Sequence, residues 1–405
     1  MKKVLSGLDV FRKNGFQGLG GLEGLGGLEG RVGLGERVGL LVHPASVADD
    51  LTHAVEIFKG KLGKRLVCLM GPQHGLYGET QDNMIEWKDF HEATFGLPVY
   101  SLYGKSRKPP KEVLETLDTL VIDLQDVGAR YYTFIWTMAL CLEACAEQKV
   151  QLVVLDRPNP LGGLKVEGNV SLEGFLSFVG LFPLPPCYGL TMGELACWLN
   201  REYRINAHLT VVWMEGWKRR MVFSDTGLPW VAPSPNMPRL QTAWVYPGMC
   251  LLEGTNISEA RGTTLPFEMF GAPFIRPWDL VRELRQYSLP GVVFRPCYFQ
   301  PTFHKFHGEL CAGAQLHVMD WEAFKPYLTG IAILRAIHKL YPDRLQWKSP
   351  PYEYEYEKLP IDILFGTDRI RQQIELQVPL SEIEESWAAG LDEFLKIRHN
   401  YLHYE

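Results

Sequence analysis

From residue 38 onward, short runs of apolar residues alternate along the chain with stretches of helical periodicity. The apolar runs are VGLLVH, RLVCLM, PVYSLYG, TLVIDLQD and QLVVLD, and the helical stretches lie near residues 52–59, 110–117 and 132–148. Continuous Val, Leu and Ile runs of this length are typical of parallel strands that are buried on both faces. Their alternation with helices predicts an α/β fold built on a doubly wound parallel sheet.

A proline-rich stretch, GLPWVAPSPNMPRL at residues 227–240, interrupts this alternation and indicates a connection between two domains. We expect residues 38–240 to form the domain with the parallel sheet and residues 241–405 to form a smaller α/β domain. The chain before residue 38 contains a glycine-rich repeat, GLGGLEGLGGLEGRVGLGERVGL. This repeat does not match GxGxxG, and it precedes a strand instead of following one. Residues 1–37 are therefore interpreted as an N-terminal segment with a flexible insertion, and not as a phosphate-binding loop.

The composition is that of an ordinary soluble globular protein, with 46% hydrophobic and 22% charged residues among 405. The formal net charge of −6 argues against a general nucleic-acid binder, which needs a basic face. No apolar stretch is long enough to span a bilayer, and MKKVLSGLDVFRKNGF lacks the apolar core of a secretion signal, so a cytoplasmic protein without a membrane partner is expected. The eight cysteines form no CxxC pair and are expected to be buried thiols. The oligomeric state stays open.

Polar side chains follow three of the predicted strands, directly after each apolar run. In a parallel sheet the carboxyl ends of the strands meet at one edge, and ligands bind in the crevice beyond that edge. Three clusters at one edge therefore predict a single site. The alternative is that the Asp and Asn residues only cap turns and helix starts. The clusters consist of His74 and Glu79, of Asp123, Gln125, Asp126 and Arg130, and of Asp156, Arg157 and Asn159.

Several common kinds of catalytic site have no matching motif in the sequence. GxSxG, GxxxxGK[ST] and HExxH are all absent, which argues against an α/β-hydrolase, a P-loop nucleotide hydrolase and a zincin. His304 and His307 stand close together in FHKFHGE, but the sequence identifies no third metal ligand. We interpret both as structural or substrate-contact histidines and predict no metal site.

Carboxylates remain as the candidate catalytic groups. Paired carboxylates, one of them with a raised pKa, are the usual equipment of glycoside hydrolysis. Tyr131 and Tyr132 offer a surface for a sugar ring, and Arg130 beside them offers a cation for an acidic sugar. The alternative is a structural network of Arg and Asp side chains with core tyrosines. The candidate carboxylates, all in predicted loops at strand ends, are Glu79, Asp123, Asp126, Asp156, Glu253 and Glu259.

Several long stretches form a recognisable set: TLVIDLQDVGARYYTFIWTM, VVLDRPNPLGG, PSPNMPRLQTAWVYPGMCLLEGTNISEARGTTLPFEMFGAPF and GAQLHV. Together they closely resemble the exo-β-N-acetylmuramidase (NamZ-like) glycoside hydrolases. The resemblance runs from about Leu5 to the C-terminus and is interrupted by the glycine repeat. It implies a Rossmann-like N-terminal domain, a smaller C-terminal α/β domain and an active site in the cleft between them. It also implies release of N-acetylmuramic acid from the non-reducing ends of peptidoglycan fragments, without a metal or organic cofactor.

The opening motif of this family differs by one residue here. Many members carry Pro-Glu-His, whose glutamate is the favoured catalytic acid, whereas this chain has Gln73 before His74. A glutamine amide cannot act as a general acid or base. The role would then pass to Glu79, at a position usually acidic in the family, or to Glu253 in the EGTN segment. The alternatives are a non-catalytic amino-sugar-binding or regulatory protein on the same scaffold and a glycosidase for a different amino sugar.

A site selective for N-acetylmuramic acid needs a cation for the carboxylate of its lactyl group, preferably an arginine. Arg130 is the first candidate because two tyrosines adjoin it, and Arg261 in SEARGTT is the second. Arg157 is expected to pair with Asp156 instead, and Glu79 is expected in one cleft with His74, Asp123 and Glu253. The predicted substrate-binding residues are Asp123, Asp126, Arg130, Tyr131, Tyr132, Asp156, Arg157, Asn159, Asn256, Glu259 and Arg261.

Overall fold

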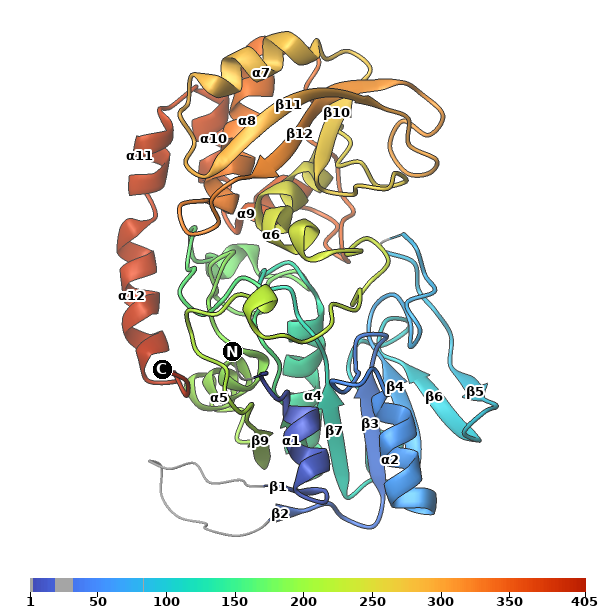
Figure 1. The fold of residues 1–405 in the computed structure, drawn as a ribbon. Helices are drawn as coiled ribbons and strands as arrows, with labels where there is room; N and C mark the ends of the chain where they lie inside the picture. The colour runs from blue at the N-terminus through green and yellow to red at the C-terminus, as the bar shows by residue number, and fades with distance from the viewer. Residues whose placement is uncertain (1–2, 19–31, 83) are drawn as a thin grey trace.

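The computed structural model describes residues 3–18, 32–82 and 84–405, and its largest element is a seven-stranded sheet (Figure 1). The strand order is β5-β6-β4-β3-β7-β8-β9, and every neighbouring pair except β5 with β6 is parallel. This confirms the prediction of a doubly wound parallel sheet. The strands are β3 (Val38–Val42), β4 (Leu66–Gly71), β5 (Phe90–Glu92), β6 (Leu97–Ser101), β7 (Thr119–Asp123), β8 (Gln151–Leu155) and β9 (Leu209–Val212).

Alternate side chains of the strands enter two separate hydrophobic cores, one on each face of the sheet. In β3, Leu40 and Val42 pack in one core with helices α1 (Gly7–Lys13) and α2 (Ala54–Leu62). Leu41 packs in the other core with α4 (Phe134–Gln148), α5 (Met192–Glu202) and the short α3 (Lys111–Leu114). Burial on both faces explains why the strands contain almost only apolar residues.

The direction in which strands are added reverses at β3. From β3 the chain first builds outward through β4 and β6, and then returns to add β7, β8 and β9 on the other side. In sheets of this kind, ligands bind at the carboxyl ends of the strands beside such a reversal. This rule points to the loops after β3 and β7, and the loop after β4 ends at the same edge of the sheet.

A second, smaller domain follows, and it contains a three-stranded antiparallel sheet in the order β10-β12-β11 covered by helices (Figure 1). The prediction of a second α/β region is confirmed, whereas the exact domain boundaries stay predictions. The strands are β10 (Met269–Ala272), β11 (Val292–Phe299) and β12 (Cys311–Val318). The helices are α6 (Leu240–Met249), α7 (Pro277–Arg285), α8 (Pro326–Leu340), α9 (Pro360–Phe365), α10 (Arg369–Glu375), α11 (Leu380–Glu385) and α12 (Ala388–His399).

The last helix, α12, leads the chain back to the large sheet, near α5 (Figure 1). Arg398 donates a hydrogen bond to the carbonyl oxygen of Gly189 at 2.6 Å, and the hydroxyl of Tyr404 donates to Asp156 Oδ2 at 2.5 Å. The ring of His403 stacks on Trp213 with 3.9 Å between centroids. The end of the chain therefore fastens the C-terminal helices to the first domain.

β1 (Gln17–Gly18) and β2 (Val32–Gly33) form a short antiparallel pair. Residues 19–31 of the glycine-rich repeat lie outside the described residues, so their interpretation as a flexible insertion stays a prediction. The last part of the repeat is described and forms β2 and the start of β3. Among the helices that the structure describes, none combines the length and the apolar character needed to cross a membrane.

Candidate active site

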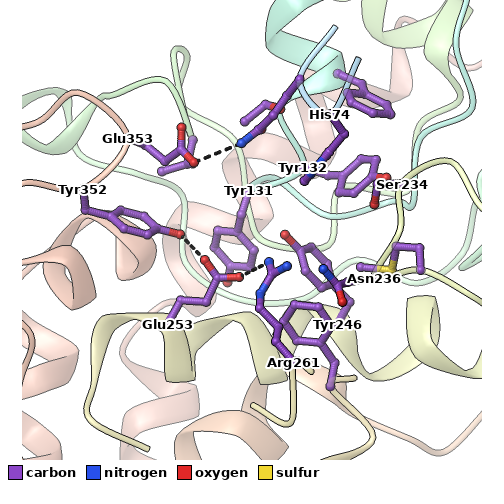
Figure 2. Close-up of a pocket in the computed structure, with 16 residues that line it drawn as sticks. His74, Tyr131, Tyr132, Ser234, Asn236, Tyr246, Glu253, Arg261, Tyr352 and Glu353 are labelled. Atoms are coloured by element: carbon purple, nitrogen blue, oxygen red, sulfur yellow. Dashed lines mark hydrogen bonds and ion pairs between the residues drawn. The ribbon is translucent and has the colours of Figure 1, made fainter. Parts of the chain in front are cut away.

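A pocket lies between the loop after β4 and the second domain (Figure 2). The loop after β4 contributes Gln73 and His74, the residues before α4 contribute Tyr131 and Tyr132, and η4 (Cys250–Gly254) contributes Glu253. Segments far apart in the sequence thus meet in one cavity. Its lining consists of Gln73, His74, Tyr131, Tyr132, Thr133, Phe134, Val179, Ser234, Asn236, Met237, Tyr246, Glu253, Arg261, Phe267, Tyr352 and Glu353.

His74 stands in the pocket wall and is held in its neutral form. Its φ angle of 73° turns the loop, and its Nδ1 lies 2.8 Å from the carbonyl oxygen of Thr80. A carbonyl can only accept, so Nδ1 carries the proton and Nε2 keeps a lone pair. Burial lowers the pKa of His74 to about 4. At neutral pH, His74 is therefore an uncharged acceptor and not a cation.

Gln73 belongs to a chain of hydrogen bonds that ends on Glu353. The hydroxyl of Thr133 donates to Gln73 Oε1 at 2.6 Å, and Gln73 Nε2 donates to Glu353 Oε1 at 3.2 Å. The hydroxyl of Tyr103 donates to the other carboxyl oxygen, Glu353 Oε2, at 2.8 Å. Two donors from the first domain therefore fix a carboxyl group that the second domain supplies.

Glu353 is poised to hold a proton near neutral pH. Its side chain is 3% exposed, and this burial, together with the negative charge of Glu253, raises its pKa to about 7 against the hydrogen bonds from Tyr103 and Gln73. A carboxylic acid in this range is suited to protonate a leaving group. The backbone at Glu353 and Tyr354 has φ angles of 45° and 68°, a strained left-handed conformation of the kind that concentrates at functional sites.

Glu253 faces the same pocket and has partners of a different kind (Figure 2). Arg261 Nη2 donates to Glu253 Oε1 at 2.7 Å, and the hydroxyl of Tyr352 donates to Oε2 at 2.8 Å. The two glutamates of the pocket therefore have different partners, a guanidinium and a tyrosine hydroxyl for Glu253, and an amide and a tyrosine hydroxyl for Glu353.

Arg261 connects Glu253 to a second buried carboxylate, Glu259. Arg261 Nε lies 3.4 Å from Glu259 Oε1, and Lys305 Nζ donates to Glu259 Oε2 at 2.9 Å. Although burial opposes ionisation, Lys305 and His304 hold the pKa of Glu259 well below its usual range. Arg261 is only 5% exposed, yet its Nη1 donates to no residue in the described part of the chain. Two nitrogens of this buried guanidinium, Nε and Nη1, therefore have no hydrogen-bond partner among the described residues.

His304 contacts this cluster of charged side chains. Its Nδ1 lies 3.1 Å from Glu259 Oε1, and its Nε2 lies 3.9 Å from Asp82 in the loop after β4. His307 is exposed. Within residues 3–18, 32–82 and 84–405, no group of three or more His, Cys, Asp and Glu side chains is arranged to hold a metal ion.

Three tyrosines give the pocket an aromatic wall. The rings of Tyr132 and Tyr246 meet edge to face with 5.9 Å between centroids, and Tyr131 meets Tyr246 in the same way at 6.4 Å. The hydroxyl of Tyr131 donates to the carbonyl oxygen of Pro247 at 3.2 Å, which fixes its ring. Such amphipathic rings give a ligand apolar contact area beside a polar hydroxyl group.

Asp123 and Arg157 form a buried ion pair at the carboxyl edge of the sheet, outside the pocket. Arg157 Nε donates to Asp123 Oδ1 at 2.6 Å, and Nη2 donates to Oδ2 at 2.8 Å and to the carbonyl oxygen of Val47 at 2.9 Å. This corrects two expectations. Arg157 pairs with Asp123 and not with Asp156, and Asp123 does not reach the cleft, because the bidentate pair occupies both of its oxygens.

Asp126, Asp156 and Asn159 also lie outside the pocket, and their contacts are those of turn and cap residues. Asp156 accepts hydrogen bonds from four donors, among them two at the start of α5 and one near the C-terminus. Asp126 accepts from the backbone N–H of Gly128 at 2.6 Å and from the hydroxyl of Tyr188. Asn159 closes a turn with its own backbone and donates to a neighbouring carbonyl. The three polar clusters therefore do not converge on a single site.

Arg130 is buried away from the pocket, which corrects its expected place beside the sugar. Its guanidinium donates to the carbonyl oxygens of Asn169 at 3.1 Å, Leu184 at 2.6 Å and Leu364 at 2.6 Å. Its side chain is 0% exposed. Arg130 thus ties together three backbone segments, one of them from the second domain.

Glu79 and Asn256 are likewise not brought to the pocket. Glu79 is exposed and accepts a hydrogen bond from the backbone N–H of Tyr77 at 3.0 Å within its own loop. Gly75, with a φ of 91°, leaves room for this carboxylate, since a Cβ there would lie 2.5 Å from it. Asn256 binds backbone groups of a neighbouring loop. The expectation that Glu79 shares a cleft with Glu253 is therefore wrong.

The residue most clearly missed from the sequence is Glu353. It stands in PPYEYEYEK, an alternation of aromatic and acidic residues that follows neither the period of a helix nor a hydrophobic strand pattern. It contacts Gln73 across 280 positions of sequence. The other missed pocket residues are Thr133, Phe134, Val179, Ser234, Asn236, Met237, Tyr246, Phe267 and Tyr352.

Two family models match nearly the whole chain after the glycine repeat. The model for the N-terminal part of the exo-beta-N-acetylmuramidase NamZ covers residues 38–241, and the model for its C-terminal part covers residues 244–404. This chain belongs to the NamZ family. A curated relative, the peptidoglycan beta-N-acetylmuramidase NamZ of Bacillus subtilis (strain 168), is 45% identical over 365 residues, which cover 90% of this chain and 86% of that protein.

Two solved structures of DUF1343 family proteins from Bacteroides fragilis NCTC 9343 share the fold. The first has a TM-score of 0.86 and 34% identity and covers all of both chains. The second has a TM-score of 0.76 and 25% identity and covers 100% of this chain and 99% of that chain. In this NamZ family member the opening motif, Gln73 and His74, lies in the pocket wall.

Proposed function

We propose that this protein is a glycoside hydrolase that releases N-acetylmuramic acid from the non-reducing ends of peptidoglycan fragments. The observation that carries the proposal is the pair of buried glutamates in one pocket, Glu353 and Glu253, with opposite partners. Glu353 is set to hold a proton near neutral pH, and Glu253 is paired with the guanidinium of Arg261, an arrangement that fits the two carboxyl groups of glycoside hydrolysis. The muramidase named among the relatives, at 45% identity, supports the same substrate class.

Glu353 is the general acid in this proposal. Its proton moves to the glycosidic oxygen as the bond from that oxygen to the anomeric carbon breaks, so the leaving sugar departs neutral. Positive charge develops on the anomeric carbon and the ring oxygen, and the carboxylate of Glu253 stabilises it. Water then supplies a hydroxyl group to the anomeric carbon, and its remaining proton restores the acid.

Arg261 supplies the cation for the lactyl group in place of Arg130. N-acetylmuramic acid differs from N-acetylglucosamine by a lactyl ether that bears a carboxylate. Arg261 lines the pocket and keeps Nη1 free of partners in the described chain, while Nη2 holds Glu253. A hydrogen bond from a guanidinium to a carboxylate stabilises by about 1.5–3 kcal/mol, enough to separate the two sugars.

Every step is assigned to protein side chains, so the proposal needs no cofactor. We place the reaction in the cytoplasm. The eight cysteines are unpaired, and all except Cys197 are buried, which is typical of proteins from a reducing compartment.

Turnover of a chromogenic β-N-acetylmuramide tests the proposal. The purified protein is expected to release the chromophore from the muramide at least roughly tenfold faster than from the matching β-N-acetylglucosaminide, a difference of about 1.4 kcal/mol. The corresponding natural disaccharide is expected to yield free N-acetylmuramic acid. Absence of turnover on every amino-sugar glycoside, together with tight binding of N-acetylmuramic acid, would overturn the proposal in favour of a sugar-binding protein.

A further inference from the structure

Gln73 stands where many family members have a glutamate, and its side chain takes part in the hydrogen bonding of the pocket. Its side chain is 6% exposed and lies between Thr133 and Glu353. The hydroxyl of Thr133 donates to the side-chain carbonyl oxygen of Gln73. The amide NH2 group of Gln73 therefore faces Glu353 and donates a hydrogen bond to it. An amide can orient a carboxyl group in this way, but it cannot exchange a proton with it.

We propose that Gln73 is a positioning residue, which fixes the carboxyl group of Glu353 in the pocket and sets the pH range in which this group can donate a proton. The role of Glu353 as acid rests on the proposed function. The contact between Gln73 and Glu353 does not, and it is measurable without any substrate.

The physical basis is a balance between burial and hydrogen bonding at Glu353. Burial favours the protonated form, and the N–H of Gln73 favours the ionised form, because it donates to a carboxyl oxygen at 3.2 Å. A glutamate in place of Gln73 would put a second carboxyl group at this distance. Two carboxylates so close cannot both ionise readily, and the pair keeps one proton to higher pH.

Other groups around Glu353 contribute but stay the same in a Gln73 variant. The hydroxyl of Tyr103 and the guanidinium of Arg107 favour the ionised form, whereas the charge of Glu253 favours the protonated form. Arg107 is held in place by stacking on Tyr354, with its Cζ 3.7 Å from the ring centroid. A change in the titration of Glu353 after a substitution at residue 73 therefore reports on Gln73 itself.

The test compares Gln73→Met, which removes the donor at similar volume, with Gln73→Glu, which replaces it by a second carboxyl group. The titration of Glu353 is followed in protein with isotope-labelled glutamate δ carbons by NMR, and its signal is identified by its loss in Glu353→Gln. The wild-type midpoint is expected near 7. It is expected to rise by about one pH unit in Gln73→Met, since one hydrogen bond to a charged group is lost, and further in Gln73→Glu.

A matched control is Gln315→Met, which removes another buried glutamine, one that accepts a hydrogen bond from Arg295 at 2.6 Å in the second domain. It should leave the midpoint unchanged. In the active enzyme, the fall of kcat/KM at high pH should move upward with the midpoint in the Gln73 variants. An unmoved midpoint in folded Gln73→Met and Gln73→Glu would overturn the inference. A moved midpoint in a protein without turnover would overturn the proposed function and leave the positioning role standing.

Discussion

Two regions with buried carboxylates, the carboxyl edge of the large sheet and the pocket, differ in how these groups are surrounded. At the sheet edge, Asp123 has both oxygens occupied by Arg157, and Asp156 is surrounded by four donors. In the pocket, Glu253 and Glu353 also have fixed partners, but both line a cavity between the loop after β4 and the second domain.

This difference shows why a charged residue at a strand end does not by itself mark a site. A carboxylate whose partners complete its hydrogen bonding in a closed environment serves the fold, and its removal leaves a buried partner uncompensated. A carboxylate that lines a cavity beside an unused donor, such as Arg261 Nη1, has hydrogen-bonding capacity left for a ligand. Substitutions in the two regions should therefore separate activity from stability.

The largest effect is expected for Glu253→Gln. Loss of the negative charge opposite the developing positive charge should lower kcat by about 10²–10³-fold, the scale of one electrostatic contact in a transition state. The one carbonyl oxygen of the glutamine can still accept from Arg261, its NH2 group can donate to the hydroxyl oxygen of Tyr352, and Arg261 keeps Glu259 as a counter-charge, so thermal unfolding should shift by only a few degrees. Steady-state kinetics and calorimetry check this. Wild-type turnover by the variant would remove Glu253 from the mechanism.

Asp123→Asn should produce the opposite pattern. It leaves Arg157 buried without a counter-charge and should lower the free energy of unfolding by about 3 kcal/mol. Urea unfolding measures the loss, and kcat measured at low temperature on the folded variant should stay near the wild-type value. If stability is unchanged and turnover is abolished, the sheet edge is catalytic after all.

A smaller effect is expected on selectivity. Arg261→Lys keeps a charge beside Glu253 but loses the planar fork, so the preference for muramide over glucosaminide should fall by roughly tenfold. The matched control is Arg130→Lys, which should destabilise the protein and keep the preference. The ratio of kcat/KM on the two glycosides measures the preference of each variant. A loss of preference in Arg130→Lys but not in Arg261→Lys would identify Arg130 as the residue that binds the lactyl carboxylate.

The smallest effect is expected for Glu79→Gln. Its carboxylate is exposed and contacts only its own loop among the hydrogen bonds described, so kcat/KM should change by less than about twofold. The same assay measures it. A loss comparable to that of Glu253→Gln would mean that this loop moves into the pocket when substrate binds.

The large sheet could be predicted from the sequence because strands that are buried on both faces consist of continuous apolar runs. Part of the site could also be predicted from the sequence. Gln73, His74, Glu253 and Arg261 stand in polar loops directly after apolar segments, and all four line the pocket.

The rest of the site was not predictable for physical reasons. Glu353 meets Gln73 only because the second domain packs against the loop after β4, and no local period connects positions 280 residues apart. Arg130 was misplaced because its partners are backbone carbonyls, which carry no signature in the sequence. Arg157 pairs with Asp123 and not with the adjacent Asp156, because the neighbouring strands β7 and β8 bring the side chains of Asp123 and Arg157 together.

The most direct test of the account is the dependence of Glu353→Gln on the leaving group. The dinitrophenolate group of a dinitrophenyl muramide leaves without being protonated. The leaving sugar of the natural disaccharide needs a proton on its oxygen. The account predicts that Glu353→Gln loses roughly 10²–10⁴-fold in kcat/KM on the disaccharide and keeps most of its rate on the dinitrophenyl glycoside. Equal losses on both substrates, or no loss on either, would contradict the assignment of Glu353 as the acid.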